Sequence, residues 1–150
     1  LKGYYSDTAV TYAVGRISPL ARRLMDVTRQ SLEEGIKAMR SGGYLTDISH
    51  AVQEYVEENH FSVVYSYAGH GIGTEMHEEP QVPNLGPPGH GPRLQPGIVL
   101  AIEPMVNAGR ADVEVLGDGW TVVTKDRSLS AHFEHSIALG ENGPVVLTVL

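Results

Sequence analysis

Three acidic residues stand where carboxylates are uncommon, inside stretches that otherwise favour buried strands. Glu103 ends the apolar run "IVLAI", Glu134 lies within "AHFEHSIAL", and Asp7 lies in the Tyr- and Thr-rich stretch 4–14. A buried carboxylate is costly unless it is paired or bound to a cation, and a second carboxylate nearby adds repulsion. Each residue taken singly is more often a solvated edge-strand residue or half of an ion pair. Taken together, they suggest a divalent metal site.

His70 lies in "YAGHGIGTEMHEEPQVPN", residues 67–84, with a glycine on each side. The dinucleotide-binding pattern G-x-G-x-x-G would need a third glycine at Thr74, and no Walker-type phosphate loop is present. We expect the glycines to bend the backbone tightly so that the ring of His70 points inward. The residue is then either a hydrogen-bonded loop histidine or a metal ligand.

Other common catalytic patterns do not fit this sequence. His77 begins "HEEPQ", which lacks the second histidine of the zinc-protease motif H-E-x-x-H and contains a helix-breaking proline. The segment "HFEH", residues 132–135, does not match the inverted motif, and no G-x-S-x-G nucleophile elbow is found. Metal-assisted chemistry with oxygen and imidazole ligands therefore remains, since the chain contains no cysteine.

Composition narrows the class of protein further. The 150 residues are 41% hydrophobic, enough for one core, and their formal net charge is -7 with no basic run. Nucleic acid is therefore a poor partner, and no apolar stretch approaches the roughly 18 residues of a membrane span. The absence of cysteine favours a cytoplasmic protein.

The elements that must position these residues follow from periodicity and turn signals. We expect strands over 4–14 and 61–65 and several more in the second half, including "GIVLAIEPM", a hairpin around Gly117 to Gly119, "AHFEHSIAL" and a last strand through Leu150. One helix starts at Ser18-Pro19 and is closed by Gly42-Gly43; a second is capped around Thr46 or Asp47 and ends near Asn59. Residues 79–97 hold so many prolines and glycines that no regular element is expected. The result is a single α+β domain, mainly an antiparallel sheet with helices on one face.

Four segments in order resemble the type I methionine aminopeptidases: "SDT", "GHGIGTEMHEEPQVPN", "PGIVLAIEPMVNAG" and "DGWTVVTKDRSLSAHFEHSI". The resemblance runs from about Gly3 to Leu147. It implies the pita-bread fold and removal of the N-terminal methionine from nascent proteins and peptides by a metal-activated water. The implied partner is a peptide or nascent-chain N-terminus, and the implied assembly of the full-length protein is a monomer.

The resemblance also assigns roles to individual residues. It implies two divalent ions, Co, Mn, Fe or Zn, whose ligands here are Asp7, His70, Glu103 and Glu134. Glu103 would carry the proton of the attacking water to the leaving amine, and His77 would contact the substrate and help to stabilise the transition state. Met76 and Trp120 match positions of the pocket for the methionine side chain, although either residue is also readily explained as ordinary core.

The sequence departs from the family pattern in places. The family has a further aspartate ligand upstream of Asp7, at a place that lies before Leu1, so we expect residues 1–150 to be the C-terminal portion of one catalytic domain. We expect this portion alone to bind metal poorly and to be inactive unless the missing segment is supplied by another chain. Met76 replaces a common aromatic residue, and His132 replaces the usual glutamine. Two rival functions remain, a prolidase or aminopeptidase P-like Xaa-Pro peptidase and a non-catalytic peptide- or protein-binding module of the pita-bread type.

Overall fold

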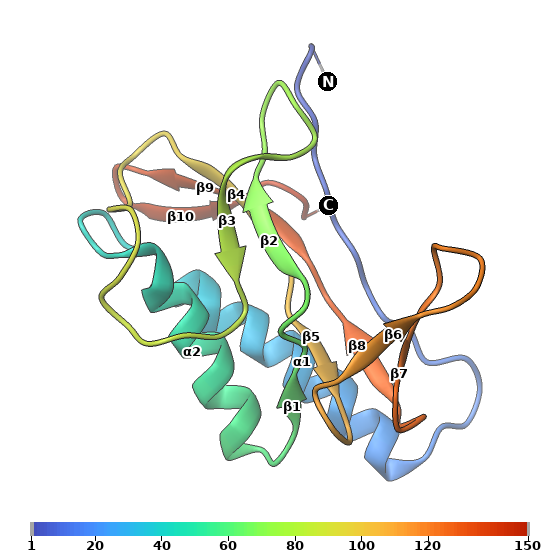
Figure 1. The fold of residues 1–150 in the computed structure, drawn as a ribbon. Helices are drawn as coiled ribbons and strands as arrows, with labels where there is room; N and C mark the ends of the chain where they lie inside the picture. The colour runs from blue at the N-terminus through green and yellow to red at the C-terminus, as the bar shows by residue number, and fades with distance from the viewer. Residues whose placement is uncertain (1, 150) are drawn as a thin grey trace.

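The computed structural model of the chain describes residues 2–149, which form two helices and three antiparallel sheets (Figure 1). The helices are α1 (Pro19–Ala38) and α2 (Leu45–Glu58). The strands are β1 (Ser62–Val63), β2 (Ala68–Gly71), β3 (Glu78–Pro83), β4 (Val99–Ile102), β5 (Met105–Asn107), β6 (Val113–Val115), β7 (Val122–Thr124), β8 (Ser130–His132), β9 (His135–Gly140) and β10 (Gly143–Val146).

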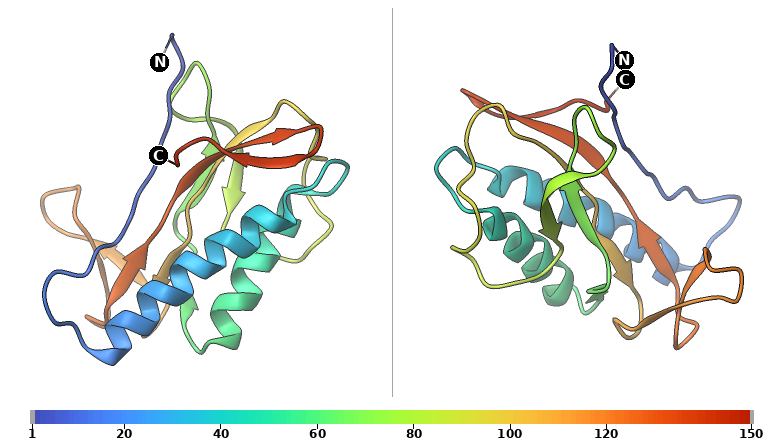
Figure 2. Two further views of the ribbon diagram at one scale, coloured as in Figure 1. Left: turned by 180° about the vertical axis from the view of Figure 1, so that it is seen from behind. Right: turned by 45° about the horizontal axis from the view of Figure 1, so that its top comes forward.

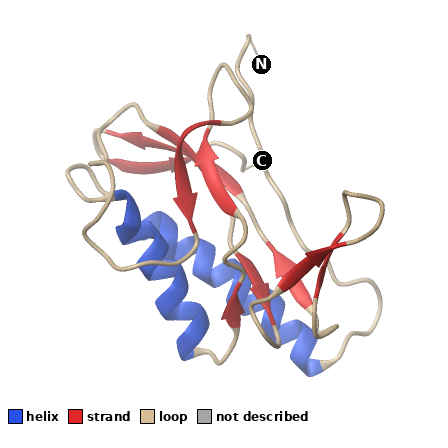
Figure 3. Ribbon diagram, viewed as in Figure 1, coloured by secondary structure: helices blue, strands red, loops and turns tan. Residues whose placement is uncertain are grey.

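Five strands form the largest sheet, in the order β10-β9-β4-β2-β3, while β1-β5-β8 form a second sheet and β6-β7 a separate hairpin. All of these pairings are antiparallel. Both helices pack on one side of the strands (Figure 2 and Figure 3). The expected α+β architecture is therefore confirmed. No helix within residues 2–149 is long and apolar enough to cross a membrane.

The two large sheets are joined by strand pairs that pass from one to the other. β4 pairs with β9 in the five-stranded sheet, with Ile102 opposite His135, and β5 pairs with β8 in the second sheet, with Met105 opposite His132. Between these two ladders, Glu103 and Pro104 on one side and Phe133 and Glu134 on the other form no ladder pairs. The stretch "AHFEHSIAL", expected as one strand, is thus two strands interrupted at Phe133 and Glu134.

Both helices form where their apolar spacing predicts, with shifted ends. The hydroxyl of Ser18 accepts a hydrogen bond from the N–H of Ala21, and Pro19 is the first helical residue, as expected. The first helix ends at Ala38, before the glycines expected to close it, because Met39 leaves the helical conformation and is fully buried. The second helix begins at Leu45, before the expected cap; Asp47 is its third residue and accepts a hydrogen bond from the N–H of Tyr44.

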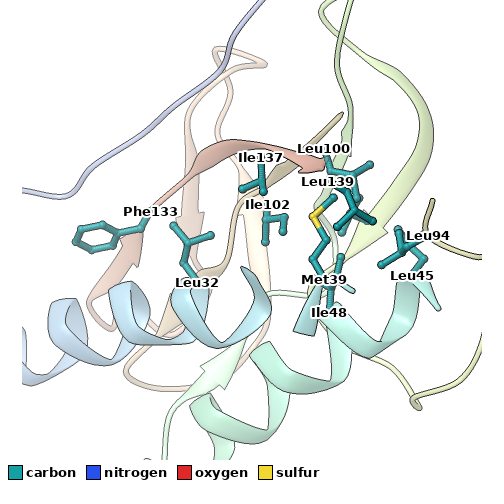
Figure 4. Packing of buried hydrophobic residues seen from close by; sticks show 11 residues of the cluster. Leu32, Met39, Leu45, Ile48, Leu94, Leu100, Ile102, Phe133, Ile137 and Leu139 are labelled. Atoms are coloured by element: carbon teal, nitrogen blue, oxygen red, sulfur yellow. The ribbon is translucent and has the colours of Figure 1, made fainter. Parts of the chain in front are cut away.

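The core lies between the helices and the five-stranded sheet (Figure 4). Its buried side chains are Leu32, Met39, Leu45, Ile48, Val82, Leu94, Leu100, Ile102, Phe133, Ile137 and Leu139. A second cluster joins the helices to β1, β5 and β8: Leu24, Val27, Val56, Phe61, Val63, Val106 and Ala131. At Gly35 a Cβ would lie 2.8 Å from Cγ2 of Val52, so glycine permits the close contact of α1 with α2.

The proline-rich segment contains a regular element, contrary to expectation. Strand β3 includes Pro80 and Pro83 and pairs with β2. It is the edge strand of the five-stranded sheet, where a residue without an N–H is tolerated because one side of the strand forms no ladder. Beyond Pro83 the segment is irregular as far as the start of β4, as expected.

The expected strand over 4–14 is not formed. This segment is extended and runs beside β8 and β9 (Figure 1), but its only bridge with regular geometry within the described chain joins Ala9 to Glu134. Hydroxyl side chains supply contacts that a backbone ladder would otherwise make. Thr8 Oγ1 donates to the carbonyl of Glu134, and Thr11 Oγ1 donates to that of His132.

The remaining strand expectations differ mainly in length. The strand expected over 61–65 covers only Ser62 and Val63, the hairpin around Gly117 to Gly119 is present as β6-β7, and the last strand ends at Val146. Leu150, to which that strand was expected to run, lies outside the described residues.

Candidate metal centre

Two carboxylates enter the site from the gap between the two large sheets. Glu103 and Pro104 separate β4 from β5, and Phe133 and Glu134 separate β8 from β9, so the two glutamates come from facing interruptions of one strand pair. The backbone of Glu134 is held by Ala9, whose carbonyl accepts from the N–H of Glu134 at 2.8 Å. The glutamates are therefore brought together by sheet register, 31 positions apart in the chain.

His70 enters the site from β2, a central strand of the five-stranded sheet, with only 7% of its surface exposed. The glycines beside it are needed for close packing of strands. A Cβ on Gly69 would overlap the carbonyl oxygen of Ala101, and one on Gly71 would overlap that of Glu79. The expected tight bend is therefore wrong, since both glycines lie in a strand, whereas the expected inward direction of the His70 ring agrees with its burial.

The ring of His70 has a defined hydrogen-bonding state. Its Nδ1 lies 2.9 Å from the carbonyl oxygen of Gly71, which can only accept, so Nδ1 carries the proton. Nε2 then presents a lone pair toward Oδ2 of Asp7 at 3.9 Å and Oε1 of Glu103 at 3.7 Å. A backbone carbonyl that fixes the tautomer in this way is typical of metal-binding histidines.

Asp7 is fixed against β9 by Ser136. The hydroxyl of Ser136 accepts from the N–H of Asp7 at 2.9 Å and donates to its carbonyl at 2.8 Å. Oδ1 of Asp7 accepts from the N–H of Thr8, which leaves Oδ2 facing His70. The extended N-terminal segment therefore delivers one carboxylate oxygen to the site.

Electrostatics at the site favour a bound cation. Glu134 is only 4% exposed, and its Oε1 has no hydrogen-bond partner among the described residues. Burial, and then the charges of Glu103 and Asp7, raise the pKa of Glu134 from 4.5 to about 7, while His132 acts in the opposite direction. Acceptors thus converge without enough donors, and a cation would resolve this imbalance.

The geometry of these acceptors also fits a metal ion. Ligand atoms of Asp7, His70 and Glu134 all lie within 4.8 Å of one another. Metal–nitrogen and metal–oxygen bonds of about 2.0–2.2 Å allow two ligands of one ion to be up to about 4.3 Å apart. The distances of 3.9 and 3.7 Å from His70 Nε2 fall within this limit. Oxygen and imidazole donors without sulfur suit Mn, Fe(II), Co or Zn.

His77 lies at the mouth of the site. It is exposed, and its ring centroid is 4.3 Å from that of His70. An open cavity of about 790 Å³ is lined by both histidines and by Glu103, Tyr67 and Met105. A substrate occupying this cavity would reach His70, Glu103 and His77 together.

Met76 and Trp120 are placed differently from the other predicted site residues. Neither lines the cavity beside His70; Met76 is half-buried, and Trp120 is 86% exposed on the β6-β7 hairpin. The structure therefore brings Asp7, His70, Glu103, Glu134 and His77 together and leaves Met76 and Trp120 outside this group.

One residue of the site was not predicted. His132, at the end of β8, places Nε2 3.5 Å from Oε2 of Glu103. The sequence offers a signal in "HFEH", where a histidine lies two residues before Glu134. Strand alternation puts positions two apart on one face, which applies here only in part because the strand is interrupted.

Comparisons with known proteins identify the family. Residues 1–141 match the sequence profile of metallopeptidase family M24. Methionine aminopeptidase 1 of Bacillus subtilis (strain 168) is 55% identical over 148 residues, which are 99% of this chain and 60% of that protein. The chain thus spans about 60% of the length of this relative and of the methionine aminopeptidases of Clostridium perfringens and Clostridium acetobutylicum.

Solved structures give the same result for the fold. Methionine aminopeptidase from Thermotoga maritima has a TM-score of 0.97 at 50% identity, and that from Rickettsia prowazekii has 0.97 at 43%. Each match covers 99% of this chain and 60% of the other. An Xaa-Pro dipeptidase from Bacillus anthracis, at 22% identity and a TM-score of 0.72, shares the fold alone. The expected pita-bread fold is confirmed.

Proposed function

This chain belongs to metallopeptidase family M24, and from that premise we propose that it carries the metal centre of an aminopeptidase that removes N-terminal methionine. The observation that carries the proposal is the convergence of Asp7, His70, Glu103 and Glu134 in a chain 55% identical to a methionine aminopeptidase. The substrate would be the N-terminus of a peptide or nascent protein.

The four residues would hold two divalent ions of the Mn, Fe(II), Co and Zn group. Two ions suit a site with three carboxylates, because a carboxylate can offer one oxygen to each ion. The ionic charge would also offset the burial and the repulsion from Glu103 and Asp7 that together raise the pKa of Glu134. Bound ions would supply Lewis acidity for the scissile carbonyl and would lower the pKa of the attacking water.

Glu103 is suited to moving a proton. It lines the cavity beside His70, and 15% of its side chain is exposed, so it can reach both the site and the solvent side. We assign to it the acceptance of a proton from the attacking water and the donation of that proton to the leaving amine. The carbonyl of Glu103 accepts a hydrogen bond from Nδ2 of Asn84, which fixes the backbone behind the carboxylate.

His77 is suited to contact the substrate without binding metal. Its ring lies against that of His70, it is exposed, and it lines the same cavity. A ring N–H there would donate to the peptide and stabilise negative charge that develops on the scissile group. Met76 and Trp120 remain proposed contacts of the methionine side chain, resting on the resemblance of their motifs and not on the present cavity.

Two broader features accompany this proposal. The acidic composition and the absence of cysteine support a cytoplasmic protein that does not bind nucleic acid. The assembly is proposed to be monomeric, as the resemblance implies.

The decisive assay uses the protein in its full cellular length and compares its cleavage of two classes of peptide. With Mn²⁺ or Co²⁺ present, we expect release of methionine from a Met-Gly-Met peptide and no cleavage of an Xaa-Pro peptide. Glu103→Gln should lower kcat by about 10²- to 10⁴-fold, whereas Glu58→Gln on the exposed end of α2 should not. Cleavage of the Xaa-Pro peptide alone would indicate a prolidase-like enzyme, and peptide binding without cleavage would indicate the non-catalytic module.

A further inference from the structure

The backbone of His132 is fixed by strand pairing and by hydrogen bonds to a side chain of the N-terminal segment. In the β5-β8 ladder it lies opposite Met105. Thr11 Oγ1 donates to the carbonyl of His132 at 2.8 Å and accepts from its N–H at 3.0 Å. One hydroxyl from the N-terminal segment therefore satisfies both the N–H and the carbonyl of His132. These two hydrogen bonds fix the backbone from which the imidazole extends.

The imidazole of His132 is directed at Glu103. Nε2 lies 3.5 Å from Oε2 of Glu103 and is buried without a hydrogen-bond partner among the described residues. The other oxygen of the same carboxylate, Oε1, faces Nε2 of His70 at 3.7 Å. Glu103 thus lies between two histidines, one facing each oxygen.

The two histidines contact Glu103 in different chemical states. Nε2 of His70 offers a lone pair, because its Nδ1 proton is used by Gly71. In this tautomer Nε2 of His70 and Oε1 of Glu103 are both acceptors, so a bound cation would satisfy the two atoms together. Oε2 faces a nitrogen that has no other partner, and a proton on that nitrogen would satisfy both atoms.

We propose that His132 is a positioning residue of the metal centre. Its Nε2–H holds Oε2 of Glu103, so that Oε1 remains directed at the ion beside His70. This inference rests on the proposed metal centre, and it predicts that His132 acts through Glu103 without binding the ion.

The surroundings of His132 support this role over a purely structural one. Its ring lines a second cavity of about 520 Å³, whose wall includes Val64, Met105 and Val122. The wall also includes Tyr67, Thr124 and Ser130, but Nε2 of His132 has no hydrogen bond to any of the described residues. An apolar residue of similar size could fill the same space but could not hold a carboxylate oxygen.

The test is made in the protein of full cellular length and uses two substitutions of similar volume and different hydrogen-bonding capacity. His132→Leu removes the donor, whereas His132→Gln retains an N–H donor. His90→Leu, in the exposed loop before β4, serves as the control for loss of an imidazole. Mn²⁺ affinity is measured by calorimetric titration, and the visible absorption spectrum of bound Co²⁺ reports the ligand geometry; thermal unfolding confirms that each variant is folded.

We expect His132→Leu to weaken Mn²⁺ binding by about tenfold or more and to alter the Co²⁺ spectrum, in line with the usual effect of removing a residue that orients a ligand. His132→Gln should remain within about threefold of the wild type. The inference is overturned if His132→Leu binds Mn²⁺ as the wild type does, or if folded His132→Gln is as impaired as His132→Leu.

A third measurement does not depend on metal or on peptide cleavage. In the metal-free chain, the ¹⁵N chemical shifts of the imidazole should show a proton on Nε2 of His132, and a bare Nε2 would contradict the inference. Absence of methionine release, with these results as expected, would count against the proposed peptidase and leave the role of His132 supported.

Discussion

Replacing Glu134 by glutamine should change stability in opposite directions with and without metal. In the metal-free chain the fold raises the pKa of Glu134 from 4.5 to about 7, mainly by burial. The protonated carboxyl is therefore favoured by folding, and this stabilisation is complete below about pH 4.5 and is lost as the pH rises through about 7. A shift of that size corresponds to about 3 kcal/mol. Glutamine does not ionise, so it avoids the cost of a buried negative charge. At pH 8 the metal-free variant should therefore be more stable than the wild type by up to about 3 kcal/mol.

Divalent metal should reverse the order. An ion at one thousand times its Kd stabilises the folded state by about 4.1 kcal/mol, which exceeds the difference of about 3 kcal/mol expected without metal, and the variant lacks one of the carboxylates that bind the ion. Urea unfolding followed by circular dichroism, at pH 5 to 8 with EDTA or with Mn²⁺, measures both effects. Glu58→Gln, at an exposed site on α2, is the matched control. The reasoning fails if the metal-free difference between Glu134→Gln and wild type does not grow with pH, or if Mn²⁺ stabilises both chains equally.

Four further predictions test other parts of the argument. Gly69→Ala should lower the free energy of unfolding by about 1–3 kcal/mol, measured by urea unfolding, because its Cβ would overlap the Ala101 carbonyl; equal stability would disprove the close packing. Asp7→Asn should weaken Mn²⁺ binding by about tenfold or more in calorimetry while leaving the metal-free fold intact. Trp120→Ala should change stability by less than about 0.5 kcal/mol because the side chain is exposed, and it should raise KM for methionyl peptides only if the side chain contacts substrate. Residues 1–150 alone should release little methionine from a Met-Gly-Met peptide, and robust release would refute that expectation.

The parts of this structure that sequence predicted well are those decided by local chemistry. The first helix follows from Ser18, Pro19 and an apolar stripe, all within one segment, and the start lies at the predicted residue. Glu103 and Glu134 were identified as candidate ligands because a carboxylate inside an apolar run is costly wherever the run ends up in the fold. Such arguments need no knowledge of the pairing partner.

The parts that were wrong depend on partners distant in the chain. Pro80 and Pro83 were assigned to an irregular segment, yet they fit a strand because β3 is at the edge of its sheet, which only the complete sheet order reveals. The glycines beside His70 suggested a bend, but their role is to admit the carbonyls of Ala101 and Glu79. The place of His132 in the site is not predicted for the same reason, since its closeness to Glu103 arises from the pairing of β5 with β8.

The interrupted strands explain how a site with several carboxylates forms inside a sheet. A continuous β4–β5 ladder would commit the backbone of Glu103 to regular pairing and would alternate its neighbours between the two faces. The observed break lets the chain pass from the five-stranded sheet to the three-stranded sheet. The facing break at Phe133 and Glu134 lets the chain pass between the same two sheets, from β8 to β9. Each break releases one glutamate, and the backbone of Glu134 is paired instead with Ala9, next to Thr8 and Asp7. An acidic residue in each two-residue gap between successive strands therefore suits this centre, because the interruption that frees the carboxylate of Glu134 also brings the N-terminal ligand to it.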